Sequence, residues 1–153
     1  MEQNSKTHRL MAALRKMKSV DIWDISSELP KSELICLHNL CYLEEKMEKT
    51  GVSLLIDTIH MHAAAVSRAL KNLEKKGLII RSIDPNNHRN VLVNSTLAGR
   101  ELNSKLREQA RRYWNDVFAR IPDADVDLLI DMLNEMTDSM KEVLQIYKSN
   151  IAR

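Results

Sequence analysis

The spacing of apolar and polar positions changes from a helical to a strand-like period within residues 61–96 of this chain. In the first half of that stretch, apolar side chains recur at intervals of three and four, which predicts an amphipathic helix ended by Gly77. Its apolar positions are Val66, Ala69, Leu70 and Leu73. The β-favouring runs Leu78–Ile80 and Val91–Val93 follow, with the turn-rich segment Asp84–Asn90 between them. The pattern predicts a helix followed directly by a β-hairpin with a polar tip.

Three further helices are expected before this stretch. Their predicted bounds are about Ser5 to Trp23, Pro30 to Lys49 and Leu54 to Ile59. Pro30 suits the first turn of the second helix, Thr50-Gly51 ends it, and Ser53 can cap the third. The turn His60-Met61-His62 then joins two helices, which is the layout of a helix-turn-helix.

Two long helices are expected after the hairpin, the first capped by Thr96 and the second beginning at Asp123 or Asp125 after the break at Pro122. Their apolar stripes are Leu102, Leu106, Ala110, Tyr113, Val117 and Ile121, then Val126, Leu129, Ile130, Leu133, Met136, Met140, Val143, Leu144 and Tyr147. This is more apolar surface than a small lobe needs. We therefore expect these helices and the first one to bury it against a second copy in a twofold homodimer.

Composition supports a compact, mainly helical protein. The 153 residues are 44% hydrophobic and 29% charged, with only three glycines and three prolines. No apolar run approaches the roughly 20 residues that span a bilayer, and the polar N-terminus lacks the apolar region of a signal peptide. With two cysteines and no export signal, a cytoplasmic protein without a membrane partner is expected.

Positive charge is concentrated in the middle of the chain. Residues 61–112 hold eleven Lys and Arg against four Asp and Glu, a net +7, whereas residues 1–60 sum to −1 and residues 113–153 to −4. Clustered cations neutralise phosphates, so the coincidence of this charge with the helix and hairpin predicts a winged helix that binds double-stranded DNA. The alternative interpretation is an ordinary solvated basic face.

The order of elements and several short motifs resemble the MarR family of bacterial transcriptional regulators. These motifs are V-S-R at Val66–Arg68, L-E-K-K-G-L-I at Leu73–Ile79, D-P at Asp84-Pro85, Arg89 in the tip, and T-L-A-G-R at Thr96–Arg100. The resemblance implies a homodimer on a pseudo-palindromic operator, usually a repressor, often released by a small ligand or by oxidation. It also implies one domain over 1–153, with a winged helix-turn-helix lobe at 30–96 and a helical dimerisation region at 1–29 plus 97–153.

Two departures from the family pattern shape the expected DNA contacts. The tip has Asn87-His88-Arg89 where relatives often have Asp-Arg-Arg, and the recognition helix opens with His62-Ala63-Ala64-Ala65. Small side chains can touch thymine methyls but donate no hydrogen bond, so sequence-specific contacts should fall mainly on His62, Ser67, Arg68 and Lys71. The expected DNA-binding residues are His62, Ala63, Ala64, Ser67, Arg68, Lys71, Arg81, Asn87, His88 and Arg89.

Other functions remain as alternatives. Cys36 and Cys41 lie roughly 140° apart around a helix, at about 100° per residue, so they favour buried core thiols over a shared metal or a disulfide. A redox- or metal-responsive regulator of the same fold, or a winged helix that binds protein, are the rival hypotheses. No catalytic or cofactor motif appears, so neither an enzyme nor a cofactor is predicted. Met17, Trp23 and Met47 are suggested to line an effector site.

Overall fold

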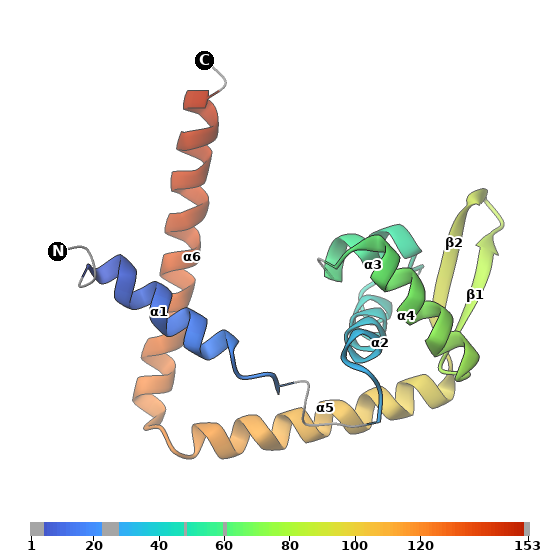
Figure 1. Cartoon of the computed structure of the whole chain (residues 1–153), viewed down its shortest axis with the longest axis horizontal. Helices are drawn as coiled ribbons and strands as arrows, with labels where there is room; N and C mark the ends of the chain where they lie inside the picture. The colour runs from blue at the N-terminus through green and yellow to red at the C-terminus, as the bar shows by residue number, and fades with distance from the viewer. Residues whose placement is uncertain (1–4, 23–27, 48, 60, 152–153) are drawn as a thin grey trace. The chain divides into compact units, whose positions relative to one another are not determined.

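The computed structural model describes residues 5–22, 28–47, 49–59 and 61–151, with Arg89 described in its backbone alone. Six helices and one hairpin follow one another along these residues (Figure 1). They are α1 (Lys6–Lys18), α2 (Lys31–Glu44), α3 (Val52–Ile59), α4 (Ala63–Lys75), β1 (Ile79–Asp84), β2 (Asn87–Ser95), α5 (Leu97–Phe118) and α6 (Asp123–Ile151). The chain forms two compact units, 1–110 and 111–153, whose boundary falls within α5. The mainly α fold with a small β-hairpin is confirmed.

Helix α2 is the centre of the core of the first unit. Its side chains Leu37 and Leu40 are fully buried, and α3, α4 and β2 pack around it. The buried partners from these elements and β1 are Leu55, Val66, Ala69, Leu70, Leu73, Ile79 and Val93. Leu102 and Leu106, from the first half of α5, are partly buried against the same core. The four apolar positions predicted for α4 are therefore its buried face.

Helix boundaries differ from the prediction where apolar periodicity continues beyond the core. Helix α2 ends at Glu44, not at Lys49, because Leu43 is its last buried side chain and Met47 is exposed. Pro30 is the N-cap of α2 and lies just outside its first turn. Helix α3 begins at Val52, so Ser53 lies inside the helix and does not cap it.

The first helix is also shorter than expected. Helix α1 is capped by Ser5, whose hydroxyl accepts the His8 N–H at 3.1 Å, and it ends at Lys18. The Ser19 hydroxyl donates to the carbonyl of Lys16 at 2.7 Å and so satisfies a terminal acceptor. The predicted end at Trp23, and His60 in the predicted turn before α4, lie outside the described residues.

The hairpin is longer, and its turn shorter, than the sequence suggested. Strands β1 and β2 are antiparallel, and the turn itself is only Pro85-Asn86. Ile83 pairs with Val91 and Asp84 with Asn87, so residues 88–90 form a bulge in β2. The predicted tip Asp84–Asn90 is thus largely strand. The Asp84 carboxylate accepts the Asn86 N–H at 3.0 Å, which holds the turn.

The joint between α4, the hairpin and α5 depends on two glycines and a threonine. Gly77 follows the C-cap of α4 with a φ of 69°, the left-handed conformation that glycine adopts readily. The Thr96 hydroxyl donates to the carbonyl of Gly77 at 2.7 Å and accepts the Gly99 N–H at 3.1 Å. Thr96 therefore caps α5, as predicted, and ties its start to the end of α4.

The second unit holds the end of α5 and the whole of α6. Trp114 stacks on Phe118 with ring centroids 5.5 Å apart. Within the described part of α6, no residue is buried. Its exposed apolar side chains include Leu129, Leu133, Met140, Leu144 and Tyr147. None of the helices described here is both long and apolar enough to cross a bilayer.

Candidate nucleic-acid interface

Helix α4 presents one buried and one exposed face. The exposed face, called here the outer face, carries Ala64, Arg68, Lys71 and Lys75. At about 100° per residue these four positions point away from the buried Val66, Leu70 and Leu73. The outer face is therefore available to a partner along the full length of the helix.

The predicted contact residues of α4 and its N-cap are all exposed. They are His62, Ala63, Ala64, Ser67, Arg68 and Lys71. His62 is the N-cap, with an extended backbone whose carbonyl accepts the N–H groups of Ala65 and Val66. Its imidazole makes no capping hydrogen bond, so the side chain is not committed to the helix end.

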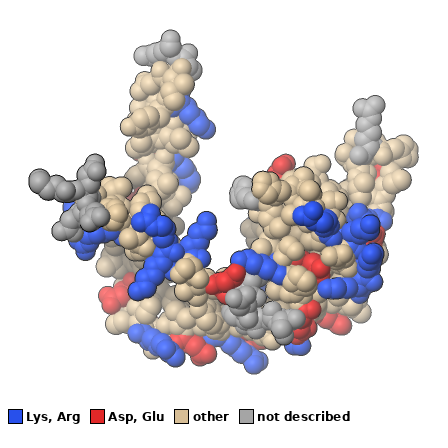
Figure 2. Space-filling view, in the orientation of Figure 1, with Lys and Arg blue, Asp and Glu red and all other residues tan. Residues whose placement is uncertain are grey.

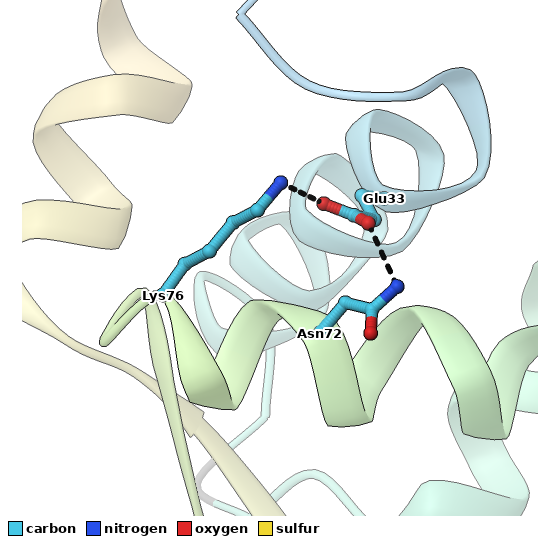
Figure 3. A network of polar contacts seen from close by, with 3 residues as sticks. All are labelled: Glu33, Asn72 and Lys76. Atoms are coloured by element: carbon cyan, nitrogen blue, oxygen red, sulfur yellow. Dashed lines mark hydrogen bonds and ion pairs between the residues drawn. The ribbon is translucent and has the colours of Figure 1, made fainter.

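One flank of α4 is bound to α2 by a buried carboxylate (Figure 3). Glu33, in the first turn of α2, is only 3% exposed. One of its oxygens accepts a hydrogen bond from Asn72 Nδ2 at 3.0 Å, and the other is 2.6 Å from Lys76 Nζ. The Lys76 side chain is itself exposed, and its ammonium is paired with this buried carboxylate.

The other flank of α4 is bound to the hairpin. Arg81 of β1 donates to the Glu74 carboxylate from Nε at 2.9 Å, and a second donation comes from Nη2. These hydrogen bonds lower the pKa of Glu74 and raise the pKa of Arg81 from their usual values. Arg81, a predicted DNA contact, is thus already paired with an acidic side chain.

Three cations of α4 remain without such a partner. Among the described residues, Arg68, Lys71 and Lys75 make no ion pair, whereas Lys76 and Arg81 do. Figure 2 shows Lys and Arg side chains gathered over α4 and the base of the hairpin. Unpaired cations on one exposed helix face form a surface suited to the phosphates and base edges of a duplex.

The wing residues Asn87 and His88 are exposed in β2, just after the turn. Arg89 follows them in the same strand, and its side chain lies outside what the structure describes. Ile83 and Val91, which pair across the two strands, are also exposed. The end of the hairpin therefore carries polar side chains beside a small apolar pair.

An open cleft of about 450 Å³ lies between α4 and the hairpin, at the start of α3. Its lining comprises Gly51, Val52, Ser53, Leu54, Ser67, Arg81, Asn90 and Val91. Ser67 and Arg81 were predicted as DNA contacts, whereas Ser53 and Asn90 were not among the predicted site residues. The sequence placed Ser53 near the start of a short helix, which was the one indication that it could lie beside α4. No feature of the sequence indicated Asn90, because its position depends on the bulge in β2.

Both cysteines are buried and free. Burial, reinforced by the negative charge of Glu33, raises the pKa of the Cys36 thiol to about 11. Burial also raises the pKa of Cys41. These thiols fit the predicted core role, because a reactive cysteine needs an accessible thiolate. Met17 and Met47, suggested as effector-site residues, are exposed, and Trp23 lies outside the described residues.

Comparison with known proteins matches this architecture. Residues 36–91 match the model of the MarR family. The helix-turn-helix-type transcriptional regulator YdgJ of Bacillus subtilis (strain 168), itself uncharacterised, is 32% identical over 85 residues. That alignment covers 56% of this chain and 52% of the relative, so it spans about half of the relative's length.

Solved structures share the fold over nearly the whole chain. The transcriptional regulator BldR from Sulfolobus solfataricus has a TM-score of 0.69 and 22% identity, with 90% of this chain and 99% of that chain covered. Bordetella bronchiseptica BpsR, whose DNA binding is regulated by 6-hydroxynicotinic acid, has a TM-score of 0.65 and 21% identity, with 90% and 96% covered.

The helix-turn-helix of α3 and α4, followed by the hairpin, defines a winged helix-turn-helix protein. The match of residues 36–91 to the MarR family model agrees with the resemblance inferred from the motifs of this chain.

Proposed function

We propose that this protein regulates transcription by binding duplex DNA with α4 in a major groove and with the hairpin along the flanking backbone or minor groove. The observation that carries the proposal is the outer face of α4, where Arg68, Lys71 and Lys75 are exposed and unpaired while nearby cations are bound to carboxylates. Three unpaired cations on the outer face of α4 are suited to binding a polyanionic partner.

The proposed contacts divide by chemistry. Arg68, with Ser67 and His62, would donate to base edges, since these three exposed side chains carry hydrogen-bond donors. Ala63 and Ala64 would lie against thymine methyl groups, and Lys71 would meet phosphate. In the wing and beside it, the proposed contacts are Arg81, Asn87, His88 and Arg89. Arg81 would share its guanidinium with Glu74.

A homodimer is part of the proposal, and the exposed helices support it. Helix α6 carries a long exposed apolar stripe, and α1 exposes Leu10, Met11 and Met17. Helix α1 has no acidic residue, whereas α6 begins with Asp123 and Asp125 and belongs to the acidic third of the chain. Two helices that each expose apolar side chains, one basic and one acidic, are suited to burial between two copies. In this proposal residues 1–29 and 97–153 form the dimerisation region, and residues 30–96 form the DNA-binding lobe.

Two copies related by a twofold axis would place two α4 helices in successive major grooves. Their half-sites would lie about one helical turn apart on a pseudo-palindromic operator. We further propose that the regulator is a repressor released by a small ligand, by analogy with BpsR, whose DNA binding responds to 6-hydroxynicotinic acid. It would act in the cytoplasm.

Selection of bound DNA from a random pool at physiological salt tests the proposal directly. We expect an enriched pseudo-palindrome, and binding to random duplex that weakens steeply with salt. Arg68→Ala should reduce affinity for the enriched sequence by about tenfold or more with less effect on random duplex, since base contacts carry specificity. Arg120→Ala, which removes an exposed cation of the second unit, is the matched control. Failure to retain any duplex, with capture of a protein partner instead, would refute DNA binding.

A further inference from the structure

We propose that Glu33, which lies outside both the helix-turn-helix and the wing, is a positioning residue. It would set the roll of α4, meaning the rotation of the helix about its own axis, so that the outer face can read bases. The inference rests on the proposed function, since a roll angle matters only if the outer face of α4 reads DNA. The carboxylate acts through Asn72 and Lys76 and does not itself reach the outer face.

The contacts of Glu33 are those of a buried anchor. The side chain is almost fully buried, and both of its oxygens have partners on α4. A buried carboxylate is costly unless its charge is paired and its oxygens accept hydrogen bonds. If Asn72 and Lys76 moved away from Glu33, a buried charge would be left without partners, which is energetically unfavourable. The carboxylate therefore restrains the end of α4.

The geometry restrains rotation of α4 about its own axis. Asn72 and Lys76 are one turn apart on one flank of the helix, and Glu74 binds Arg81 on the opposite flank. Apolar contacts of Val66 and Leu70 hold α4 against the core but carry little directional preference. Hydrogen bonds are directional, so the polar contacts on the two flanks define which residues face outward.

Roll affects base reading and phosphate binding differently. Hydrogen bonds to base edges need a donor within about 3 Å and well aligned, whereas a phosphate cation works over a longer range. A change in roll therefore lowers affinity for the selected operator and leaves affinity for random duplex largely intact. Loss of Glu33 also frees the Lys76 ammonium, and an additional free cation would not lower the affinity for random duplex.

The test is the ratio of affinities for the selected operator and for a random duplex of equal length, measured with folded Glu33→Ala and Glu33→Gln. We expect the ratio to fall about tenfold in Glu33→Ala, the size of one lost base contact. Glu33→Gln keeps an oxygen for Asn72 but loses the charge that binds Lys76, so it should fall about threefold. If Glu33→Ala does not fold, Glu33→Gln alone decides.

Glu45→Gln is the matched control, because Glu45 is the C-cap of the same helix and pairs with Arg107 of α5 at 2.5 Å, away from α4. Its ratio should equal that of the wild type. A ratio within twofold of the wild type in the folded Glu33 variants, or a parallel loss on both duplexes, would overturn the positioning role. A wild type that binds neither duplex would instead refute the proposed function.

Discussion

Single residues at the joint between α4, the hairpin and α5 have separate physical tasks. Gly77 is a glycine because of its backbone conformation, and nothing lies within 4 Å of the position a Cβ would take. Gly99 is a glycine because of space, since a Cβ there would lie 2.0 Å from the carbonyl oxygen of Leu78. The start of α5 therefore packs directly against the backbone that leads into β1.

Gly99→Ala should destabilise the protein by about 1–3 kcal/mol, the usual cost of overpacking, although alanine is the better helix former. Denaturant unfolding measures the change. Gly51→Ala is the matched control: the nearest atom to its new methyl group is the Val91 carbonyl oxygen at 4.0 Å, so a change within about 0.5 kcal/mol is expected. Equal stabilities of the two variants would contradict the close approach at Gly99.

Cys36 should make stability sensitive to alkaline pH. Its folded pKa of about 11 lies above the ordinary thiol value, so the folded state holds its proton more tightly. The resulting stability is fully present below about pH 9 and is lost as pH rises towards 11, by an amount on the order of 2 kcal/mol. Unfolding of the wild type and Cys36→Ala under reducing conditions should give curves that converge over this window, and parallel curves would contradict the assignment.

Residue types and their spacing predicted which side chains are exposed better than they predicted which side chains form ion pairs and hydrogen bonds with one another. The sequence correctly separated the buried and exposed sides of α4, because amphipathic periodicity reports burial directly. It could not pair Glu33 with Lys76, 43 positions away, nor identify Arg81 as the partner of Glu74. Those contacts depend on how helices pack, and charge alone does not identify a partner.

At the scale of elements, α4 and the hairpin were predicted well because the period changes abruptly between them and Gly77 marks the change. The end of α2 was predicted poorly because a helical pattern continues past Leu43, while the core that it could pack against does not. The hairpin turn was also misjudged, since a bulge lets polar residues such as Asn90 remain in a strand.

The contact between α4 and the hairpin leads to a prediction about salt. Glu74→Gln should free the Arg81 guanidinium beside the outer face of α4. The salt slope of binding to random duplex should then steepen by up to about one unit, because another phosphate can be neutralised. Titrations at several salt concentrations give the slope.

Glu45→Gln provides the comparison for this salt experiment, since it likewise frees an arginine, Arg107, but on α5. Its slope should stay at the wild-type value. An unchanged slope in Glu74→Gln as well would mean that Arg81 does not reach the backbone of the duplex even when released.

At the scale of the whole molecule, the exposed stripe of α6 is the main indication of assembly. Leu133 and Met140 lie seven positions apart on that stripe and are both exposed in the single chain. A double substitution, Leu133→Asp with Met140→Asp, should convert a homodimer to single chains, because each buried aspartate would face an apolar surface. Sedimentation equilibrium at micromolar concentration measures the change.

Ile80→Asp, at an exposed apolar position of the hairpin, is the control for that measurement and should leave the mass unchanged. A wild type that sediments as one chain would remove the dimer from the proposal. The sequence could indicate this surface, because apolar stripes without an internal partner are visible in the pattern. It could not indicate how two copies meet, since that depends on their joint geometry.

The three alanines that open α4 have a consequence for evolutionary change. Alanine is the strongest helix former, and Ala63 and Ala64 occupy little of the outward surface. In the proposed complex, a longer polar side chain there would exchange a contact with a thymine methyl group for a hydrogen bond to a base edge. Substitutions at the N-terminal end of α4 could therefore change the preferred operator one residue at a time, with little effect on the stability of the fold.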